Sequence, residues 1–387
     1  VDYHNCALSL ALNNGMHRID TNDPIFWRTP GYPTYVSWFY KWFGLKGVRF
    51  EDNKDAIEAS LYVQIALASL IPIILYYLAF LLSQNTILAL TMAWISVLHP
   101  GLIFSSTFFL TEGLALIFFY LFLLFFYQLT LTKRNLNTRL FICFAASASL
   151  SIYTWMRPMG EFIGLFSVIL LLVCARNTWK NNALTAGLFA LLFFASLFPW
   201  YLRNYKLTGE WFFCPTIGTY LNVFSAPKIL RRTTGKPLIE CHKIQQQKAA
   251  QLIHTRKKHM KDKIISNNIC KEIAYPIIKN NIGYFIYEWI IEVLKTTFDL
   301  YSYQMIPMLD DTYWYDPLEE LLPNKLADCL YRHAMPMPLR IICWIELICA
   351  VLLWIGFFCG LVFFGLYNLL RKLPDKTMFI IWVTASV

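Results

Sequence analysis

Long apolar stretches without charged side chains dominate the first half of the chain. From Ala59 to Thr111 there is no Asp, Glu, Lys or Arg. A helix needs about 20 residues to cross the hydrocarbon core of a bilayer, so this stretch is long enough for two crossings. The polar residues 83–86 predict the turn between them, which gives spans near residues 59–82 and 87–107. Irregular backbone is not tolerated against lipid, so we expect these spans to be α-helices.

Further apolar stretches follow the same pattern to the end of the chain. They predict an all-α polytopic membrane protein with at least 7–8 transmembrane helices, outer juxtamembrane helices and a mainly helical outer insertion. The charge-free stretches lie between Glu112 and Lys133, Arg139 and Arg157, Glu161 and Arg176, and Lys180 and Arg203, near residues 341–370 and, as a partial span, from Lys376 to Val387.

Alternate crossings divide the chain into four segments. We expect a first outer loop with juxtamembrane helices over residues 1–55, six spans over 56–203, an outer insertion over 204–340 and C-terminal spans over 341–387. Most Lys and Arg residues of the short loops then fall on one side, which the positive-inside rule makes cytoplasmic. The sequence therefore predicts a multi-pass protein of the plasma (inner) membrane whose candidate site faces the periplasm or exterior. Val1 is not a Met and the last span is short, so we expect at least one further span before Val1.

The composition agrees with this interpretation. Hydrophobic residues make up 57% of the chain, charged residues 15% and aromatic residues 17%, and the mean hydropathy is +0.46. Soluble domains carry about 25% charged residues, so these values exclude a disordered chain, a collagen-like chain and an ordinary cytosolic enzyme. The net charge of +10 then points to membrane lipids and phosphate groups as partners, and not to nucleic acid.

A few charged residues at the outer ends of the spans come from distant parts of the chain. Charged groups near membrane depth are costly, so they are usually paired or functional. They can line one outer cavity, or each can be an ordinary interfacial anchor. The set consists of Arg28, Glu112, Arg157, Glu161 and Arg203.

Arg28 opens the sequence Arg-Thr-Pro-Gly-Tyr-Pro, in which two prolines flank a glycine. This pattern predicts a tight, non-helical turn over residues 28–33. The aromatic residues that follow predict a short helix from Thr34 to Gly44 at the membrane interface. Farther along, residues 284–301 predict an amphipathic helix that lies on the membrane or on other helices.

These motifs resemble, in their order and spacing, those of a family of membrane enzymes. The turn over residues 28–33 with its aromatic helix is similar to the first outer loop of the polytopic type-C (GT-C fold) glycosyltransferases. These are the relatives of the dolichyl-phosphate-mannose protein mannosyltransferases and of the bacterial aminoarabinose transferase. The resemblance covers roughly residues 1–300, and its further landmarks are Tyr3 to Ala11, Leu98 to Glu112, Arg157-Pro158, Pro199 to Tyr205 with Gly209, and Ile273 to Leu300.

The resemblance implies a GT-C-like bundle and a glycosyltransferase reaction. Such an enzyme moves a hexosyl or pentosyl group, with inversion, from a polyprenyl-phosphate-linked donor to an acceptor hydroxyl on the outer face of the membrane. The lipid-linked sugar is then a co-substrate, and the acceptor is a protein, a lipid or a glycan, as in protein or cell-envelope glycosylation. The family varies in its need for a divalent metal, and the seven His residues form no zinc-binding motif.

Carried onto this chain, the resemblance gives the outer charged residues their roles. Asp2 is the candidate base that takes the acceptor proton. Glu112 is its alternate, or a carboxylate that binds acceptor or metal. The candidate ligands of the donor phosphate are Arg28, Arg157 and Arg203, because a guanidinium group matches the geometry of phosphate.

Tyr3, His4 and Tyr32 are candidates for contact with the sugar or the acceptor. The chain departs from the family at its start, where members carry an acidic residue or pair a few residues before the tyrosine of the juxtamembrane helix. Here Asp2 directly precedes Tyr3. Either Asp2 fills that role in a shifted register, or the acid lies ahead of Val1.

Two other functions use the same residues without sugar transfer. A transporter or flippase for a lipid-linked saccharide needs the outer arginines but forms no covalent bond. A non-catalytic membrane subunit needs neither the arginines nor bond formation. Transporters often contain internal repeats and interrupted helices near the midplane. We find no repeat in this chain, and its polar residues gather at one surface, which favours an enzyme.

Overall fold

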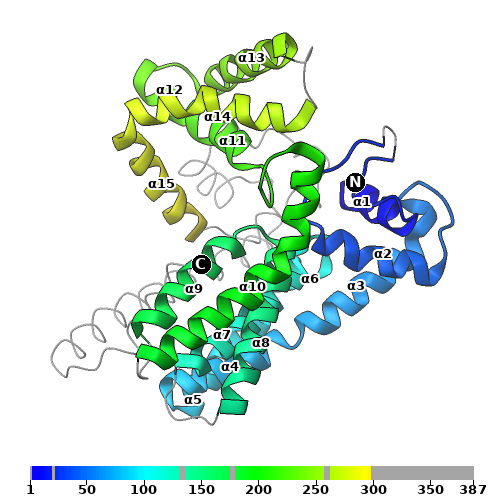
Figure 1. Ribbon diagram of the computed structural model, residues 1–387, viewed down its shortest axis with the longest axis vertical. Helices are drawn as coiled ribbons and strands as arrows, with labels where there is room; N and C mark the ends of the chain where they lie inside the picture. Colours follow the sequence, from blue (N-terminus) through cyan, green and yellow to red (C-terminus); the bar gives the residue numbers. More distant parts are fainter. Residues whose placement is uncertain (1, 20–21, 131–135, 175–178, 257–261, 298–387) are drawn as a thin grey trace, which may run out of the picture. The chain divides into compact units, whose positions relative to one another are not determined.

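The computed structural model describes residues 2–19, 22–130, 136–174, 179–256 and 262–297 (Figure 1). Helices dominate this part, and its β structure is limited to one isolated bridge between His17 and Pro24. The described residues therefore confirm the predicted all-α class. The predicted spans within residues 341–387 and the last part of the predicted insertion lie outside them.

The chain divides into two units, of which the first ends at Cys214 and the second begins at Pro215. The first contains α1 (Asp2–Ala11), α2 (Gly31–Phe43), a short 3₁₀ turn (Glu51–Asn53), α3 (Lys54–Ala68), α4 (Ile71–Ser83), α5 (Thr86–Leu98), α6 (Pro100–Thr107), α7 (Thr111–Thr130), α8 (Leu136–Met156), α9 (Gly160–Cys174) and α10 (Trp179–Thr208). The second contains α11 (Ile217–Tyr220), a π-helical turn (Leu221–Ser225), α12 (Ala226–Thr234), α13 (Leu238–Arg256), α14 (Asp262–Asn280) and α15 (Ile282–Thr297).

Several helices of the first unit are long and apolar enough to cross a membrane. Four described helices meet this condition, namely Glu51–Ser83, Thr111–Thr130, Asn137–Met156 and Trp179–Thr208. The pair α5 and α6 adds a fifth if it forms one bent span, and α9 is apolar but shorter. These helices indicate a membrane-embedded protein, whereas the full count of 7–8 spans stays a prediction.

The polar turn expected at residues 83–86 is present. α4 ends at Ser83, and Gln84 turns the chain with a left-handed φ of 55°. The side chain of Asn85 then caps α5, because it accepts a hydrogen bond from the backbone N–H of Leu88 at 3.1 Å. These two polar residues satisfy helix ends that apolar side chains leave open, which is why the polar interruption marks the boundary of the span.

The span predicted near residues 87–107 consists of two helices bent by 52° relative to each other, and it remains a candidate for one broken span. The bend lies at Pro100, which has no N–H to donate and whose ring disfavours a helical backbone in the preceding residue. His99 accordingly adopts an extended conformation with ψ of 114°. The short helix α6 that follows returns the chain through residues 108–110 into α7, where Glu112 lies in the first turn.

A buried glutamine holds this return in place. The Nε2 group of Gln64, in α3, donates hydrogen bonds to the carbonyl oxygens of Ser106 at 3.0 Å and Phe108 at 2.9 Å. Gly113 allows α6 to approach α7, since a Cβ atom there would lie 2.3 Å from the carbonyl oxygen of Ser105. Together these contacts fix the direction in which α7 begins, and therefore the position of Glu112.

Two apolar clusters form the core of the first unit. The first cluster fills the space between α7, α8 and α10, which Figure 1 shows side by side. The second cluster joins α1 and α2 to α3, α4 and the start of α7. The largest fully buried side chains of the first cluster are Phe122, Phe126, Phe189, Phe193 and Phe213, and those of the second are Tyr32 and Tyr40. The second cluster thus brings the N-terminal helices to the end of the bundle at which α7 begins.

The second unit is also helical over its described part, as expected for the outer insertion. Its small core consists of Ala226 and Ile229 from α12 and Ala274 and Ile278 from α14. Gly218 packs closely on α14, where its backbone N–H donates to Oδ1 of Asn267 at 2.8 Å. Cys241, Ala249, Ile269 and Cys270 of the same unit are buried as well.

The role of Gln64 can be tested by replacing it with leucine. The carbonyls of Ser106 and Phe108 then lose their donor, and a buried polar group without a partner costs about 1–3 kcal/mol. We expect Gln64→Leu to lower the midpoint of thermal unfolding, measured by circular dichroism of the purified protein in detergent. Gln251→Leu, at an exposed position of α13, is the matched control. Equal midpoints for the two variants contradict the role given to Gln64.

Candidate functional site

The turn that opens with Arg28 packs against the end of α8. α2 begins at Gly31, so the expected non-helical turn over residues 28–33 is wrong in its second half. The physical reason is that proline is tolerated in the first turn of a helix, where its missing N–H is not needed. The hydroxyl of Thr29 donates to the carbonyl of Met156 at 2.8 Å. A Cβ atom at Gly31 would lie 2.6 Å from the carbonyl oxygen of Trp155, so the turn rests on the residues directly before Arg157.

Arg28 contacts Tyr3, and Tyr3 in turn packs against Tyr32. Its guanidinium carbon lies 4.8 Å from the centre of the Tyr3 ring, and its Nη1 donates to the Tyr3 hydroxyl at 3.4 Å. The rings of Tyr3 and Tyr32 meet edge to face with their centres 5.3 Å apart. α1 and α2 therefore present Tyr3, Arg28 and Tyr32 as one packed group.

Glu112 and Arg157 form an ion pair between the start of α7 and the end of α8. The hydroxyl of Thr111 also donates to the Glu112 carboxylate at 3.1 Å. Both charged side chains remain partly exposed, at 41% for Glu112 and 38% for Arg157. The pair is thus accessible to a ligand, and its two members come from helix ends that the alternation of spans placed on the same side.

Tyr32 links this ion pair to the first group. Its side chain is fully buried, and its hydroxyl has no hydrogen-bond partner among the described residues. Burial raises the pKa of Tyr32 far above its ordinary value, and the negative charges of neighbouring groups, Glu112 among them, raise it further. Tyr32 therefore stays a neutral donor. We call Tyr3, Arg28, Tyr32, Glu112 and Arg157 the outer cluster.

Arg203 is engaged elsewhere. Its Nη2 donates to the carbonyl of Met16 at 3.0 Å, and its Nη1 donates to Oδ1 of Asn204 at 2.9 Å. The guanidinium carbon also lies 4.4 Å from the centre of the Trp200 ring. These contacts tie the loop after α1 to the end of α10, so the donors of Arg203 already serve the fold and it does not join the outer cluster.

His4 is likewise part of the packing. The side chain is buried, with Nδ1 at 2.7 Å from the hydroxyl of Tyr40 and Nε2 at 3.0 Å from the carbonyl oxygen of Val48. Both ring nitrogens are therefore used within the protein. The structure gives His4 the role of joining α1 to α2 and to the loop that follows, away from contact with a ligand.

The two remaining predicted acids are Glu161 and Asp2. Glu161, in the first turn of α9, accepts a hydrogen bond from the hydroxyl of Tyr201 in α10. Asp2 opens α1 next to Tyr3, and its side chain lies outside the described residues. The role of Asp2 as base stays a prediction.

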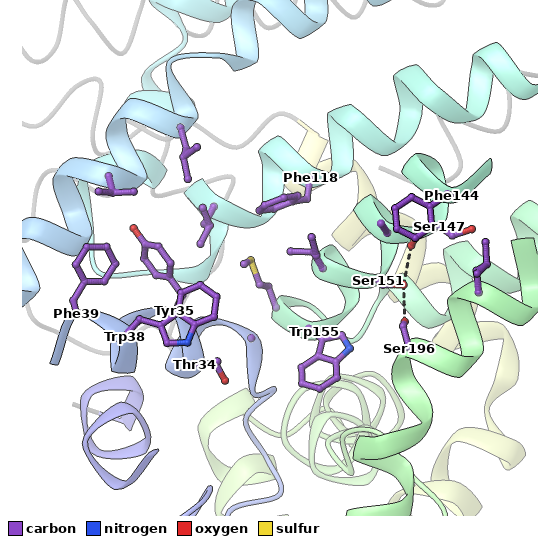
Figure 2. Close-up of a pocket in the computed structure, with 18 of the residues that line it drawn as sticks. Thr34, Tyr35, Trp38, Phe39, Phe118, Phe144, Ser147, Ser151, Trp155 and Ser196 are labelled. Atoms are coloured by element: carbon purple, nitrogen blue, oxygen red, sulfur yellow. Dashed lines mark hydrogen bonds between the residues drawn. The ribbon is translucent and has the colours of Figure 1, made fainter. Parts of the chain in front are cut away.

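An apolar groove of about 820 Å³ adjoins the outer cluster. Figure 2 shows aromatic rings of α2 on one side of it, with Trp155 and the serines of α8 and α10 on the other. The serines form a short chain in which Ser196 donates to the Ser151 hydroxyl at 2.6 Å. The lining comes from five helices and comprises Gly31, Thr34, Tyr35, Trp38, Phe39, Trp42, Val63, Leu67, Leu114, Phe118, Phe144, Ser147, Ala148, Ser151, Ile152, Trp155, Met156, Leu192 and Ser196. We call it the aromatic groove.

The position of the aromatic groove connects it to the charged residues. Gly31 and Met156 line it, and the same two positions hold the turn of Arg28 beside Arg157. The sequence reasoning missed this groove. Its one visible signal was the pair Trp38 and Trp42, which lie one helical turn apart in α2 and are 64% and 83% exposed.

The described residues contain no group of three or more His, Cys, Asp and Glu side chains that could hold a metal ion. The ionic character of the site thus rests on arginine and glutamate. No family model, curated protein or solved structure matches the chain. The function is therefore argued from the geometry of the outer cluster and the aromatic groove.

The structural role of Arg203 leads to a test by hydrogen–deuterium exchange. Hydrogen bonds to charged groups contribute about 1.5–3 kcal/mol, so Arg203→Ala should speed exchange about tenfold or more in the loop after α1. The amides of Arg18 and Ile25, which donate to the carbonyls of Asp23 and Met16, should report it. Arg231→Ala, at an exposed position of α12, serves as control. Unchanged exchange in the Arg203 variant argues against this anchor.

Proposed function

We propose that this protein is a membrane glycosyltransferase that moves a hexosyl or pentosyl group from a polyprenyl-phosphate donor to an acceptor hydroxyl, with inversion. The observation that carries the proposal is the aromatic groove, whose lining residue Met156 directly precedes Arg157 of the ion pair with Glu112. A lipid phosphate has the same two parts, an apolar chain and an anionic head. The resemblance of the chain to the type-C glycosyltransferases supports the same substrate.

The aromatic groove suits an isoprenoid chain. Its walls are aromatic and aliphatic side chains with a few hydroxyls that bond within the protein. At membrane depth such walls offer dispersion contacts to methyl-branched carbons and leave no polar group that needs water. The lining residues Gly31 and Met156 lie at the end nearest the outer cluster, so a bound chain brings its phosphate there.

Arg28 and Arg157 are the proposed ligands of the phosphate. Guanidinium groups bind phosphate oxygens through paired donors, and these hydrogen bonds strengthen as negative charge develops. Arg157 reaches the phosphate by exchanging its contact with Glu112 for the new anion. Arg203 has no part in this proposal, because its donors bind the carbonyl of Met16 and the side chain of Asn204.

Glu112 is the proposed base. When Arg157 turns to the phosphate, the carboxylate is released to accept the proton of the acceptor hydroxyl. The hydroxyl oxygen attacks the anomeric carbon as the bond from that carbon to the phosphate oxygen breaks, so the configuration inverts. The phosphate leaves as a stable anion and needs no general acid. Asp2, next to Tyr3 at the start of α1, is the alternative base.

The reaction and its two central residues can be tested together. The full-length protein is reconstituted in vesicles with polyprenyl-phosphate sugars and an acceptor mixture, and the release of polyprenyl phosphate is measured. Loss of the proton acceptor or of the phosphate ligand should lower turnover by about 100-fold or more in Glu112→Gln and Arg157→Ala. Near-normal turnover in both variants, at normal protein levels, would falsify the assignment.

A matched control keeps this test specific. Glu240, in α13, forms a surface ion pair with Lys236, so Glu240→Gln removes a comparable pair outside the outer cluster and should leave turnover unchanged. Movement of the lipid-linked sugar across the vesicle membrane without release of polyprenyl phosphate is the result expected of a transporter, and it contradicts the proposed reaction.

The aromatic groove gives a separate prediction. Ala148→Trp fills part of its wall, so long polyprenyl chains should bind less well, with KM raised about tenfold, equal to about 1.4 kcal/mol. Donors with a short chain should be affected little. Ala195→Trp changes an exposed alanine of α10 that does not line the groove and is the control. A KM that rises equally for short and long donors speaks against the groove as the chain-binding site.

A further inference from the structure

The acidic residues of α15 face α12 within the second unit. Glu288 accepts a hydrogen bond from Nε of Arg232 at 2.7 Å, and Glu292 pairs with Nζ of Lys228 at 2.8 Å. The two acids are four residues apart, so they lie on the same face of the helix. Their partners both lie in α12. These two ion pairs therefore fix the rotation of α15 about its own axis.

The exposed side of α15, as far as the described residues show, is apolar. Ile282, Ile286, Trp289 and Ile290 follow the spacing of one helical face, and their side chains are between 46% and 61% exposed. Tyr287 at the edge of this face is partly exposed, and its ring contacts the guanidinium group of Arg232 with 5.0 Å between the guanidinium carbon and the ring centre. A surface helix of a water-soluble domain has the reverse arrangement, with apolar residues inward and acids outward. The inverted pattern of α15 indicates an apolar environment outside the helix.

The chain itself supplies such an environment. α10, a candidate membrane span, ends at Thr208, and the second unit begins at Pro215. The six residues between them reach about 20 Å at full extension, so the second unit starts close to a membrane surface. Trp and Tyr favour the headgroup region, and Ile favours the acyl boundary just below it.

The charge of the second unit suits the same surface. Between Lys228 and Lys263 the sequence has eleven Lys or Arg residues and two acids. Such an excess is attracted to anionic lipid headgroups, by about 1 kcal/mol for each basic residue near the surface. We propose that α15 lies in the membrane interface with Ile282, Ile286, Trp289 and Ile290 toward the lipid, and that it anchors the second unit there. This anchor does not depend on the sugar-transfer reaction.

Photo-crosslinking of the full chain tests the anchor. p-Benzoylphenylalanine is placed at Ile286 or at Trp289, and the protein is irradiated in vesicles of phosphatidylethanolamine and phosphatidylglycerol. Mass spectrometry of the labelled peptides should find phospholipid adducts at both positions. The same group at Gln247, exposed on α13, is the comparison position and should give far fewer, because it does not belong to the apolar face of α15. At Leu191, exposed in the α10 span, it should give lipid adducts and thereby shows that the method works.

The other occupants of this face are outcomes of the same experiment. Adducts to another segment of the chain, or to a second copy, without lipid adducts overturn the proposal. So does the absence of any adduct at Ile286 and Trp289 when Leu191 reacts. Quenching by brominated lipid gives an independent measurement, since the fluorescence lost on Trp289→Phe should belong to the fraction that these lipids quench. A Trp289 signal that brominated lipid leaves unchanged contradicts the lipid contact.

Discussion

The structure of the first unit depends on one constraint, which is that backbone hydrogen-bonding groups at membrane depth must find partners within the protein. Straight helices meet this constraint by themselves, and every break needs a substitute. Where α6 ends and the chain returns to α7 the helical pattern is lost, and the carbonyls of Ser106 and Phe108 accept hydrogen bonds from the side-chain amide of Gln64 instead. That single buried side chain allows α7 to begin where it does, with Glu112 facing Arg157. The position of Glu112 in the outer cluster therefore depends on the hydrogen bonds that Gln64 donates where α6 ends.

The helix boundaries were readable from the sequence because they follow from local chemistry. Charged residues end the spans, and a polar turn with a capping asparagine separates α4 from α5. The bend at Pro100 was missed because the uninterrupted apolar run was given more weight than the missing N–H of proline. The alternation of spans predicted Glu112 and Arg157 on the same side of the membrane, and the structure joins them in an ion pair. It could not predict that Arg203 stabilises the fold whereas Arg157 joins the outer cluster. Arg203 is held by the carbonyl of Met16, which is far away in the sequence.

The aromatic groove could not be inferred for a related reason. It is formed by a difference in side-chain size between helices, with large rings on α2 facing the small residues Ser147, Ala148 and Ser151 on α8. Neither sequence pattern is unusual alone, because aromatic residues are common at membrane interfaces and small residues are common where membrane helices pack. Only the pairing of the two faces leaves space between them. That pairing is set by the contacts of Thr29 and Gly31 with the end of α8.

The contacts of the N-terminal segment also bear on how the protein is made. The hydrogen bond from Thr29 joins residues 127 positions apart, and the one from Arg203 to Met16 spans 187 positions. At a synthesis rate of about 5–20 residues per second, the loop after α1 emerges about 10–40 s before its anchor in α10 exists. During that interval the hydrogen bond from Arg203 to Met16 cannot form, whereas the apolar residues of α1 and α2 can already pack on α3, α4 and the start of α7. The loop after α1 therefore completes its native contacts only after α10 has been translated, although it lies early in the chain.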